Sequence, residues 1–290
     1  MYRLLKLLII LLAIIFSGCK ANSHVTDSVL LRIAIIGDAE PKPLAEFPNM
    51  AAAVDQINSI AKELPIDFVI GVGDIAHRGT EVQYEGATEV LHKLNPPFYP
   101  IMGNEEHEST VERYLHYAQK WNNNIESTRY VLDYDELAFV FASPDYGSEF
   151  DDSGALWIYE QLQRLAPKPV VLVVHVSQKG VFSEKPERGV GNEVFNEQVI
   201  SQPNLAVVVS GDLHMDMDRV NHSKEINNVH YLHIPGIERT KVPDTTNHTP
   251  MFRLMTIEKD GDVFIDTYEV GETTPSDKHA YSFSINSAAF

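Results

Sequence analysis

Hydrophobic residues along the chain follow two spacings, which together predict a mixed α/β fold. Short apolar runs rich in valine and isoleucine are typical of buried strands. The runs that predict strands are 30–36, 67–72, 98–102, 128–132, 137–142, 170–174, 205–209, 229–234, 251–257 and 263–268. Apolar residues at helical spacing predict helices over 47–64, 82–94, 111–118 and 153–165. Helices that alternate with strands favour a mixed sheet covered by helices.

Polar residues whose side chains bind metals follow five of these apolar runs. They are Asp38, Asp74, Asn104, His175 and the pair Asp212 and His214. The carboxyl ends of strands are where open α/β sheets place their ligands. Oxygen and imidazole donors delivered by separate loops commonly build a metal centre. A single Gly-Asp pair after a strand is more often a turn than a site, so the prediction depends on the repetition.

Length and composition are those of an ordinary globular protein. The chain has 290 residues, of which 44% are hydrophobic and 22% are charged, and α/β folds often use this length for a single core. The formal net charge of −18 argues against a nucleic-acid partner, because phosphate backbones attract lysine and arginine. A small phosphorylated substrate stays open, because bound metal ions invert the local field. We expect one domain over 30–270, with a hairpin turn at 259–262, and a loosely held polar tail over 271–290.

The N-terminal residues have the pattern of a targeting segment. A positive start at 1–6 precedes an apolar stretch at 7–16, which falls short of the roughly 20 residues of a membrane-spanning helix. Phe16-Ser17-Gly18-Cys19 resembles the lipobox of bacterial lipoproteins, although an aliphatic residue is usual in place of Phe16. The segment predicts a lipoprotein signal peptide over 1–18, lipidation at Cys19 and a tether over 19–29. A plain secretory peptide with a stray cysteine is the alternative.

Five motifs with glycine, carboxylate, amide and histidine residues occur in a fixed order between about residues 31 and 270. They are Gly37-Asp38, Gly73-Asp74-x-x-x-Arg78-Gly79, Gly103-Asn104, His175 and Gly211-x-x-His214. In order and spacing they resemble the calcineurin-like metallophosphoesterase superfamily. The resemblance implies a four-layer α/β/β/α sandwich of two mixed β-sheets. It also implies hydrolysis of a phosphomonoester or phosphodiester by a hydroxide that bridges two divalent metal ions.

The resemblance implies roles for the individual metal ligands. Asp74 would bridge the two metal ions. Asp38 and His214 would complete the first metal site. Asn104 and His175 would belong to the second metal site.

Three positions depart from the family pattern, and each has a carboxylate where histidine is usual. Glu40 and Asp212 replace metal-binding histidines, and Glu105 replaces the histidine that follows the asparagine. Carboxylates still bind metal ions, and their oxygens are harder ligands than imidazole nitrogens. The two ions are therefore expected to be Mn²⁺, Mg²⁺ or Ca²⁺, with Fe or Zn as the alternatives.

The candidate catalytic residues are Asn104, Glu105 and His107. In the family, the histidine at position 105 acts as general acid or contacts phosphate, whereas a carboxylate there would repel phosphate oxygens unless it is protonated. His107 substitutes for that histidine if the loop is two residues longer, and otherwise it lies exposed at a helix start. His77 and Arg78 are candidate phosphate-binding residues. Arg78 is equally well explained as a turn residue paired with a carboxylate.

These features predict a lipid-anchored, metal-dependent phosphoesterase that acts on a small phosphorylated substrate outside the cytoplasm. Lys20, rather than aspartate, follows Cys19, which favours the periplasmic side of the outer membrane within the cell envelope. The alternative function is that of a catalytically impaired relative, which keeps the fold and serves as a binding protein. The sequence leaves the oligomeric state open.

The variant Cys19→Ser should appear in the soluble fraction or stay unprocessed, because it has no thiol to carry a lipid. Fractionation of cells that express the wild type or Cys19→Ser measures this directly. Lys20→Ala is the matched control and should stay with the membranes. Recovery of the wild type as a soluble, unlipidated protein would contradict the prediction.

Overall fold

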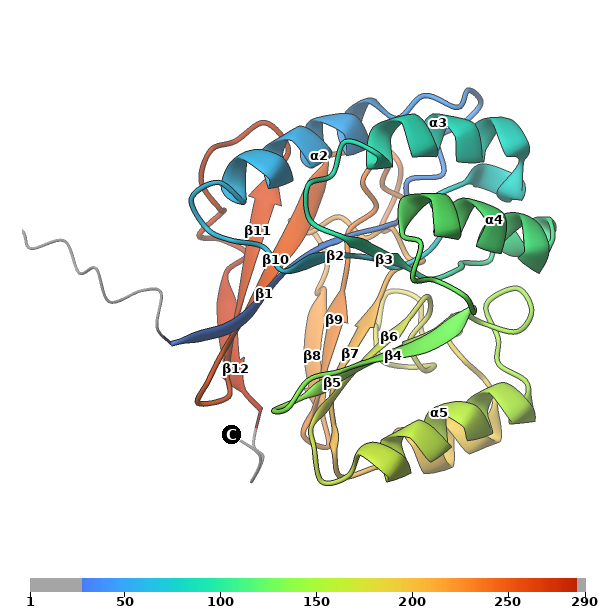
Figure 1. Ribbon diagram of the computed structural model, residues 1–290, viewed down its shortest axis with the longest axis vertical. Coiled ribbons are helices and arrows are strands. Elements are labelled where there is room, and N and C mark those ends of the chain that lie inside the picture. Colours follow the sequence, from blue (N-terminus) through green and yellow to red (C-terminus); the bar gives the residue numbers. More distant parts are fainter. Residues whose placement is uncertain (1–27, 286–290) are drawn as a thin grey trace, which may run out of the picture.

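Two six-stranded β-sheets pack face to face at the centre of the molecule (Figure 1). The computed structural model describes residues 28–285. The first sheet has the order β12-β11-β10-β1-β2-β3. Its strands are β1 (Val29–Ile36), β2 (Phe68–Gly71), β3 (Phe98–Pro100), β10 (Met251–Glu258), β11 (Asp262–Glu269) and β12 (Tyr281–Ser284). β1, β2 and β3 run parallel, whereas β10, β11 and β12 continue the sheet with antiparallel pairs.

The second sheet has the order β4-β5-β6-β7-β9-β8. Its strands are β4 (Arg129–Asp133), β5 (Ala138–Ala142), β6 (Val170–Val174), β7 (Leu205–Ser210), β8 (Ser223–Ile226) and β9 (Val229–His233). The four central strands are parallel, and β4 and β8 pair antiparallel at the two edges. Both sheets are therefore mixed, and each places several strand carboxyl ends at one edge.

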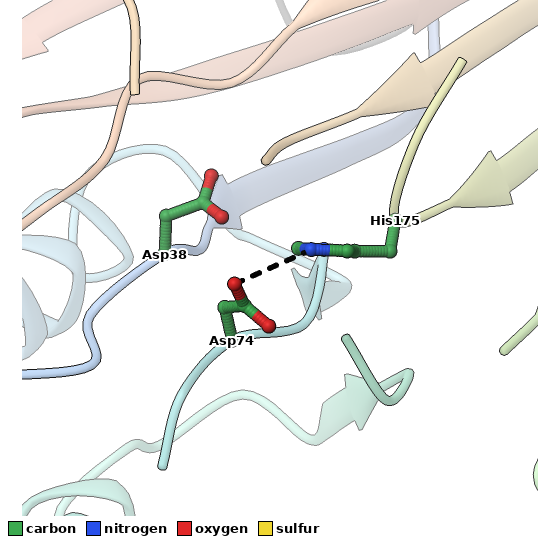
Figure 2. A group of neighbouring side chains, drawn as sticks. All are labelled: Asp38, Asp74 and His175. Carbon is green, nitrogen blue, oxygen red and sulfur yellow. Dashed lines mark ion pairs between the residues drawn. The ribbon is translucent and has the colours of Figure 1, made fainter. Parts of the chain in front are cut away.

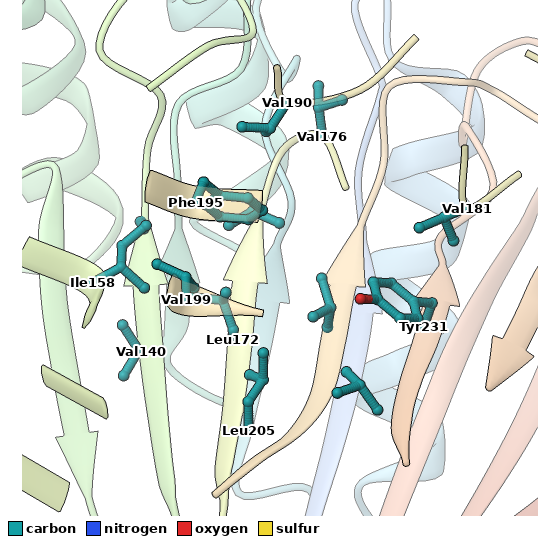
Figure 3. Close-up of a cluster of buried hydrophobic side chains, with 14 of the residues drawn as sticks. Val140, Ile158, Leu172, Val176, Val181, Val190, Phe195, Val199, Leu205 and Tyr231 are labelled. Carbon is teal, nitrogen blue, oxygen red and sulfur yellow. The ribbon is translucent and has the colours of Figure 1, made fainter. Parts of the chain in front are cut away.

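Four α-helices cover the outer faces of the sheets (Figure 1). They are α2 (Pro48–Ile60), α3 (Glu81–Leu91), α4 (Val111–Trp121) and α5 (Asp152–Leu165). The first three lie over the first sheet, where Met50 and Val54 of α2 pack with Val69. α5 lies over the second sheet, where Ile158 belongs to one apolar cluster with Leu172 (Figure 3). The predicted four-layer sandwich is confirmed.

The inner strands β2, β5 and β6 are buried along their whole length, because both faces of each sheet are covered there. Between the sheets, Ile33 and Phe68 of the first sheet share a buried cluster with Phe139 and Val173 of the second. The rings of Phe68 and Phe139 meet edge to face, with centroids 5.2 Å apart. This central core fixes the two sheets against each other and therefore fixes the relative position of the loops at their carboxyl ends.

The first sheet extends beyond the boundary expected at residue 270. β12 lies within the stretch 271–290, which the sequence predicted to be a loosely held polar tail, and it pairs with β11. Alternation in Tyr281-Ser282-Phe283-Ser284 turns both aromatic rings toward the apolar core between the sheets. This strand was not predicted because serine at every second position interrupts the apolar run. β8 and a short π-helix, Phe195–Val199, were also not predicted.

The predicted signal peptide, Cys19 and most of the predicted tether lie outside the described residues. Within residues 28–285, no helix combines the length and the apolar character that crossing a membrane requires. The first described element, β1, begins at Val29, next to the domain boundary expected at residue 30.

Candidate metal centre

The predicted metal ligands converge at the edge where the strands of both sheets end. They stand on the loops that follow β1, β2, β3, β6 and β7. The seven residues are Asp38, Glu40, Asp74, Asn104, His175, Asp212 and His214. All except Asn104 are buried. Buried charges are costly without partners, so the cluster requires compensating positive charge.

Asp74 lies at the centre of this cluster. Ligand atoms of Asp38, Asp74 and His175 lie within 4.8 Å of one another (Figure 2). Ligand atoms of Glu40, Asp74 and His214 form a second group within the same distance. Asp74 belongs to both groups, and Asp38 also lies within 3.7 Å of His214. The cluster therefore divides into two half-sites, one around His214 and one around His175, that share the Asp74 carboxylate.

The first half-site is built around His214. Its Nδ1 lies 3.1 Å from the carbonyl oxygen of Arg239, so we assign the ring proton to Nδ1. Its Nε2 lies 3.0 Å from Glu40 Oε1 and 3.7 Å from Asp38 Oδ1. Among residues 28–285 this buried Nε2 has no hydrogen-bond partner. With the proton on Nδ1, a lone pair points at carboxylate oxygens, and a cation would satisfy both.

The second half-site is built around His175. Its Nδ1 donates to the carbonyl oxygen of Val72 at 2.8 Å, which leaves Nε2 facing the cluster. Nε2 lies 3.4 Å from Asp74 Oδ2 and 3.3 Å from Asn104 Oδ1. Asp212 Oδ1 is 3.7 Å away. The two histidines therefore have the same arrangement, in which a backbone carbonyl orients the ring and the second nitrogen is presented to the oxygens.

The backbone of the ligand loops is strained. Among residues 28–285, eight non-glycine residues have positive φ. Six of them belong to the predicted site, namely Asp38, Glu40, Asp74, Arg78, Asp212 and His214. Such backbone strain concentrates at functional sites. Glycines let the carboxylates approach closely. A Cβ on Gly103 would lie 2.2 Å from Asp74 Oδ1, and one on Gly211 would lie 2.5 Å from Asp38 Oδ2.

The electrostatics of the cluster fit a divalent cation. Burial raises the pKa of Asp38 to about 6, although His214 and His175 oppose this rise. Burial works against a charged His175, yet Asp74 and Asp38 raise the pKa of this imidazole to about 10. The surroundings thus favour positive charge at the centre of the cluster. Oxygen and imidazole donors, among them two histidines whose Nε2 atoms face the carboxylates, suit a metal ion there.

Glu106 ties two of the ligand loops together. Its carboxylate accepts hydrogen bonds from the backbone N–H groups of Asp74 at 3.0 Å, Gly103 at 2.7 Å and Ala76 at 2.8 Å. Burial, together with the charge of Asp74, raises its pKa to about 7. No sequence pattern separates Glu106 from its acidic neighbours at 105–108, and such an acidic run is typical of a solvated loop. Glu106 is instead a buried support for the loops after β2 and β3.

Glu105 lies at the rim of the cluster. Its Oε2 is 2.6 Å from His77 Nδ1 and accepts the backbone N–H of Arg78 at 2.9 Å. His77 Nδ1 is also 3.9 Å from Glu40 Oε2, so these two candidate residues adjoin the first half-site. The Arg78 side chain points elsewhere. Its Nε donates to Glu108 Oε2 at 2.8 Å, and both side chains are exposed.

His107 lies on a single 3₁₀ turn, Glu106–Glu108. Its Nε2 is 2.9 Å from the carbonyl oxygen of Pro144, and burial lowers its pKa. The ring therefore bonds to a neighbouring loop and not to one of the seven ligands.

Three basic side chains that no motif indicated surround Glu40. Lys42 Nζ lies 2.9 Å from Glu40 Oε2, and Lys241 Nζ lies 2.7 Å from Glu40 Oε1. Arg239 also pairs with Glu40 Oε1, and Lys42 reaches Glu105 at 3.1 Å. Burial works against the charge of Glu40, but hydrogen bonds and the charge of Lys241 hold its pKa well below the usual range.

Arg188 is a fourth basic residue that the sequence did not indicate. Its Nε donates to Asp212 Oδ2 at 2.7 Å, and its Nη2 pairs with Asp212 Oδ1. Nη2 also donates to Asn104 Oδ1 at 3.0 Å. Arg188 and the three basic residues at Glu40 come from irregular loops, where no periodicity or motif marks them.

Solved structures with the same fold include several phosphatases. A dimetal phosphatase from Danio rerio aligns with a TM-score of 0.66 at 11% identity, over 89% of this chain and 100% of that one. Purple acid phosphatase PPD1 from yellow lupin has a TM-score of 0.62 at 15% identity, over 88% and 53%. GAP50, the anchor in the inner membrane complex of Plasmodium, has a TM-score of 0.62 at 12% identity, over 89% of each chain. At these identities the likeness concerns the fold alone.

Two curated relatives match part of the chain. A probable glycerophosphodiester phosphodiesterase GpdQ of Arcobacter nitrofigilis is 27% identical over 112 residues, which are 38% of this chain and 41% of that protein. A glycerophosphodiester phosphodiesterase GpdQ of Enterobacter lignolyticus is 26% identical over 130 residues, which are 43% and 46%. The match thus spans less than half the length of either relative.

A family model described as Calcineurin-like phosphoesterase matches residues 31–216. This range contains all the strands and loops that carry the seven ligands, and it is more than half of the chain. The chain therefore belongs to the calcineurin-like phosphoesterase family.

Proposed function

We propose that the protein is a metal-dependent hydrolase of phosphoesters. The observation that carries this proposal is the pair of half-sites that share Asp74, each with a histidine Nε2 turned toward carboxylate oxygens. When bound, two divalent ions would supply an activated water nucleophile and neutralise charge on the phosphoryl group. Mn²⁺, Mg²⁺ or Ca²⁺ are favoured, because carboxylate and amide oxygens outnumber imidazoles among the seven ligands.

The residues of the chain would divide the work between holding the ions and holding the substrate. Asp38, Glu40 and His214 would hold one ion, Asn104, His175 and Asp212 the other, and Asp74 both. These seven residues are the proposed metal ligands. A hollow of about 560 Å³ reaches the ligand Asp212 and is otherwise lined by three basic residues, one acidic residue and two apolar residues, namely Lys185, Arg188, Lys241, Glu187, Leu213 and Val242. Its volume suits a small ligand, and its basic side chains would attract the anionic phosphoester.

A small phosphodiester is the favoured substrate within this proposal, and a phosphomonoester is the alternative. The partial similarity to two glycerophosphodiester phosphodiesterases supports the diester. We also propose that the protein acts outside the cytoplasm, attached to the membrane of the cell envelope by a lipid on Cys19. The sequence pattern around Cys19 supports this location.

A proton for the leaving group would come from the pair formed by His77 and Glu105, at the rim of the first half-site. The 2.6 Å contact between His77 Nδ1 and Glu105 Oε2 supports this assignment. His107 is less suited to the role, because its ring bonds to the Pro144 carbonyl oxygen. Asn104 would act as a metal ligand and Arg78 would stay paired with Glu108.

A binding protein without catalytic activity is the second candidate function. Basic side chains already pair with Glu40 and Asp212, so part of the buried negative charge is compensated without metal ions. Buried carboxylates that have such partners can persist in a protein that no longer turns over substrate. Activity measurements separate the two candidates.

Asp74→Asn should reduce hydrolysis by at least about 100-fold, because the ligand shared by both half-sites loses its charge. Turnover of bis(4-nitrophenyl) phosphate and 4-nitrophenyl phosphate with added Mn²⁺ measures the effect. Asp135→Asn, in the exposed turn between β4 and β5, is the matched control and should keep full activity. A metal-loaded wild type that cleaves neither ester would favour the binding protein.

Glu105→Gln should lower the cleavage of alkyl phosphoesters by about 100-fold or more, and that of nitrophenyl esters much less, because the pair that supplies the proton loses its carboxyl group. A general acid contributes about 10²- to 10⁴-fold, and a poor alkoxide leaving group depends on it most. Rates for methyl and 4-nitrophenyl esters of the same phosphate are compared in the wild type and the variant. His107→Ala is the control and should change neither rate. A selective loss of alkyl ester cleavage in His107→Ala would assign the acid to His107 instead.

A further inference from the structure

The guanidinium of Arg188 is hydrogen-bonded to the oxygen atoms that the second half-site would offer to a metal ion. It forms a forked pair with Asp212 and also donates to Asn104 Oδ1 at 3.0 Å. Ser148 completes the arrangement, because its Oγ accepts from Arg188 Nη2 at 2.8 Å and donates to Asn104 Oδ1 at 3.1 Å. Asn104 follows β3 in one sheet and Asp212 follows β7 in the other. Arg188 therefore bridges the two sheets at the place where a cation would bridge them.

The loop that carries Arg188 is anchored, so this contact has a defined backbone. The N–H of Arg188 donates to the Lys185 carbonyl oxygen at 3.0 Å, and the N–H of Val190 donates to the Ser177 carbonyl oxygen at 2.8 Å. Gly189 between them has φ +145°, and a Cβ there would lie 2.5 Å from the backbone nitrogen of Lys179. The side chain of Arg188 itself is 43% exposed, so it borders the solvent.

The two half-sites differ in how many ligands a basic side chain already holds. In the first half-site, Lys42, Lys241 and Arg239 all pair with a single carboxylate, that of Glu40. Within residues 28–285, neither Asp38 nor Asp74 forms an ion pair with a lysine or arginine, which leaves these carboxylates available.

In the second half-site, Arg188 holds both Asp212 and Asn104. A divalent ion that enters there must first displace the guanidinium, or else bind with Asp74 and His175 alone. Forked arginine–carboxylate pairs are among the strong hydrogen bonds of proteins.

We propose that Arg188 is an intramolecular competitor of the second metal ion, which makes the second half-site the weaker of the two. Displacing a fixed positive charge lowers the affinity of that half-site for a divalent ion by about 10- to 100-fold, the range in which residues next to metal ligands act. The inference rests on the proposed metal centre, but it is independent of whether the protein hydrolyses an ester.

Calorimetric titration of the metal-free full chain with Mn²⁺ tests the inference. The wild type should bind one ion tightly and a second ion weakly. Arg188→Ala should tighten the weak step about 10- to 100-fold and leave the tight step unchanged. Arg188→Lys keeps the positive charge but cannot form the forked pair with Asp212, so its affinity for the second Mn²⁺ ion should be intermediate. Lys62→Ala is the matched control and should bind Mn²⁺ as the wild type does, because Lys62 is an exposed basic residue in the turn after α2 and lies on none of the ligand loops.

Thermal unfolding provides a second readout. The increase in Tm that Mn²⁺ produces should be larger for Arg188→Ala than for the wild type, because tighter binding to the native state stabilises it more. Two Mn²⁺-binding steps of equal affinity in the wild type would overturn the proposal that Arg188 competes with the second ion. A weak step that Arg188→Ala leaves unchanged or weakens further would overturn it as well. Absence of Mn²⁺ binding in the wild type and in every variant would overturn the proposed metal centre itself.

Discussion

Repulsion among buried carboxylates is the constraint on which the rest of this structure depends. Asp38, Glu40, Asp74 and Asp212 meet between two sheets, where water does not screen their charges. Glu40 and Asp212 pair with lysine or arginine, whereas within residues 28–285 the ion-pair partners of Asp38 and Asp74 are histidines. Those histidines present ring nitrogens to the carboxylates, which is the arrangement of metal ligands. A divalent cation would relieve the repulsion that the protein's own side chains leave at the centre.

The fold supplies the free energy that holds such a cluster together. The apolar core between the sheets fixes the positions at which β1, β2, β3, β6 and β7 end. Glu106 then binds three backbone N–H groups and joins the loops of Asp74 and Gly103. Positive φ values at the ligand positions record the strain that this convergence imposes. The rigid sandwich therefore fixes where the loops begin, and the strained loops bring the proposed ligands together.

Strand positions and the order of the ligands followed from the sequence, because apolar runs that end in glycine and a polar residue are local patterns. β12 escaped prediction because serine alternates with its aromatic residues. Glu106 escaped because burial cannot be read from an acidic run such as 105–108. Lys42, Arg188, Arg239 and Lys241 reach the cluster from irregular loops, and no local pattern encodes such tertiary contacts. The sequence therefore predicted which polar side chains gather at the edge of the sheets, but no pattern in it indicated the basic side chains that pair with them.

Anomalous X-ray diffraction at the manganese absorption edge, from crystals of the metal-free protein soaked in Mn²⁺, tests the central claim most directly. A strong anomalous peak bounded by Asp38, Asp74 and His214 is expected, with a weaker one beside Asp74 and His175 where Arg188 has moved away. A structure with no anomalous peak within reach of Asp74, in which Lys241 and Arg188 keep their contacts with Glu40 and Asp212, would contradict the metal centre.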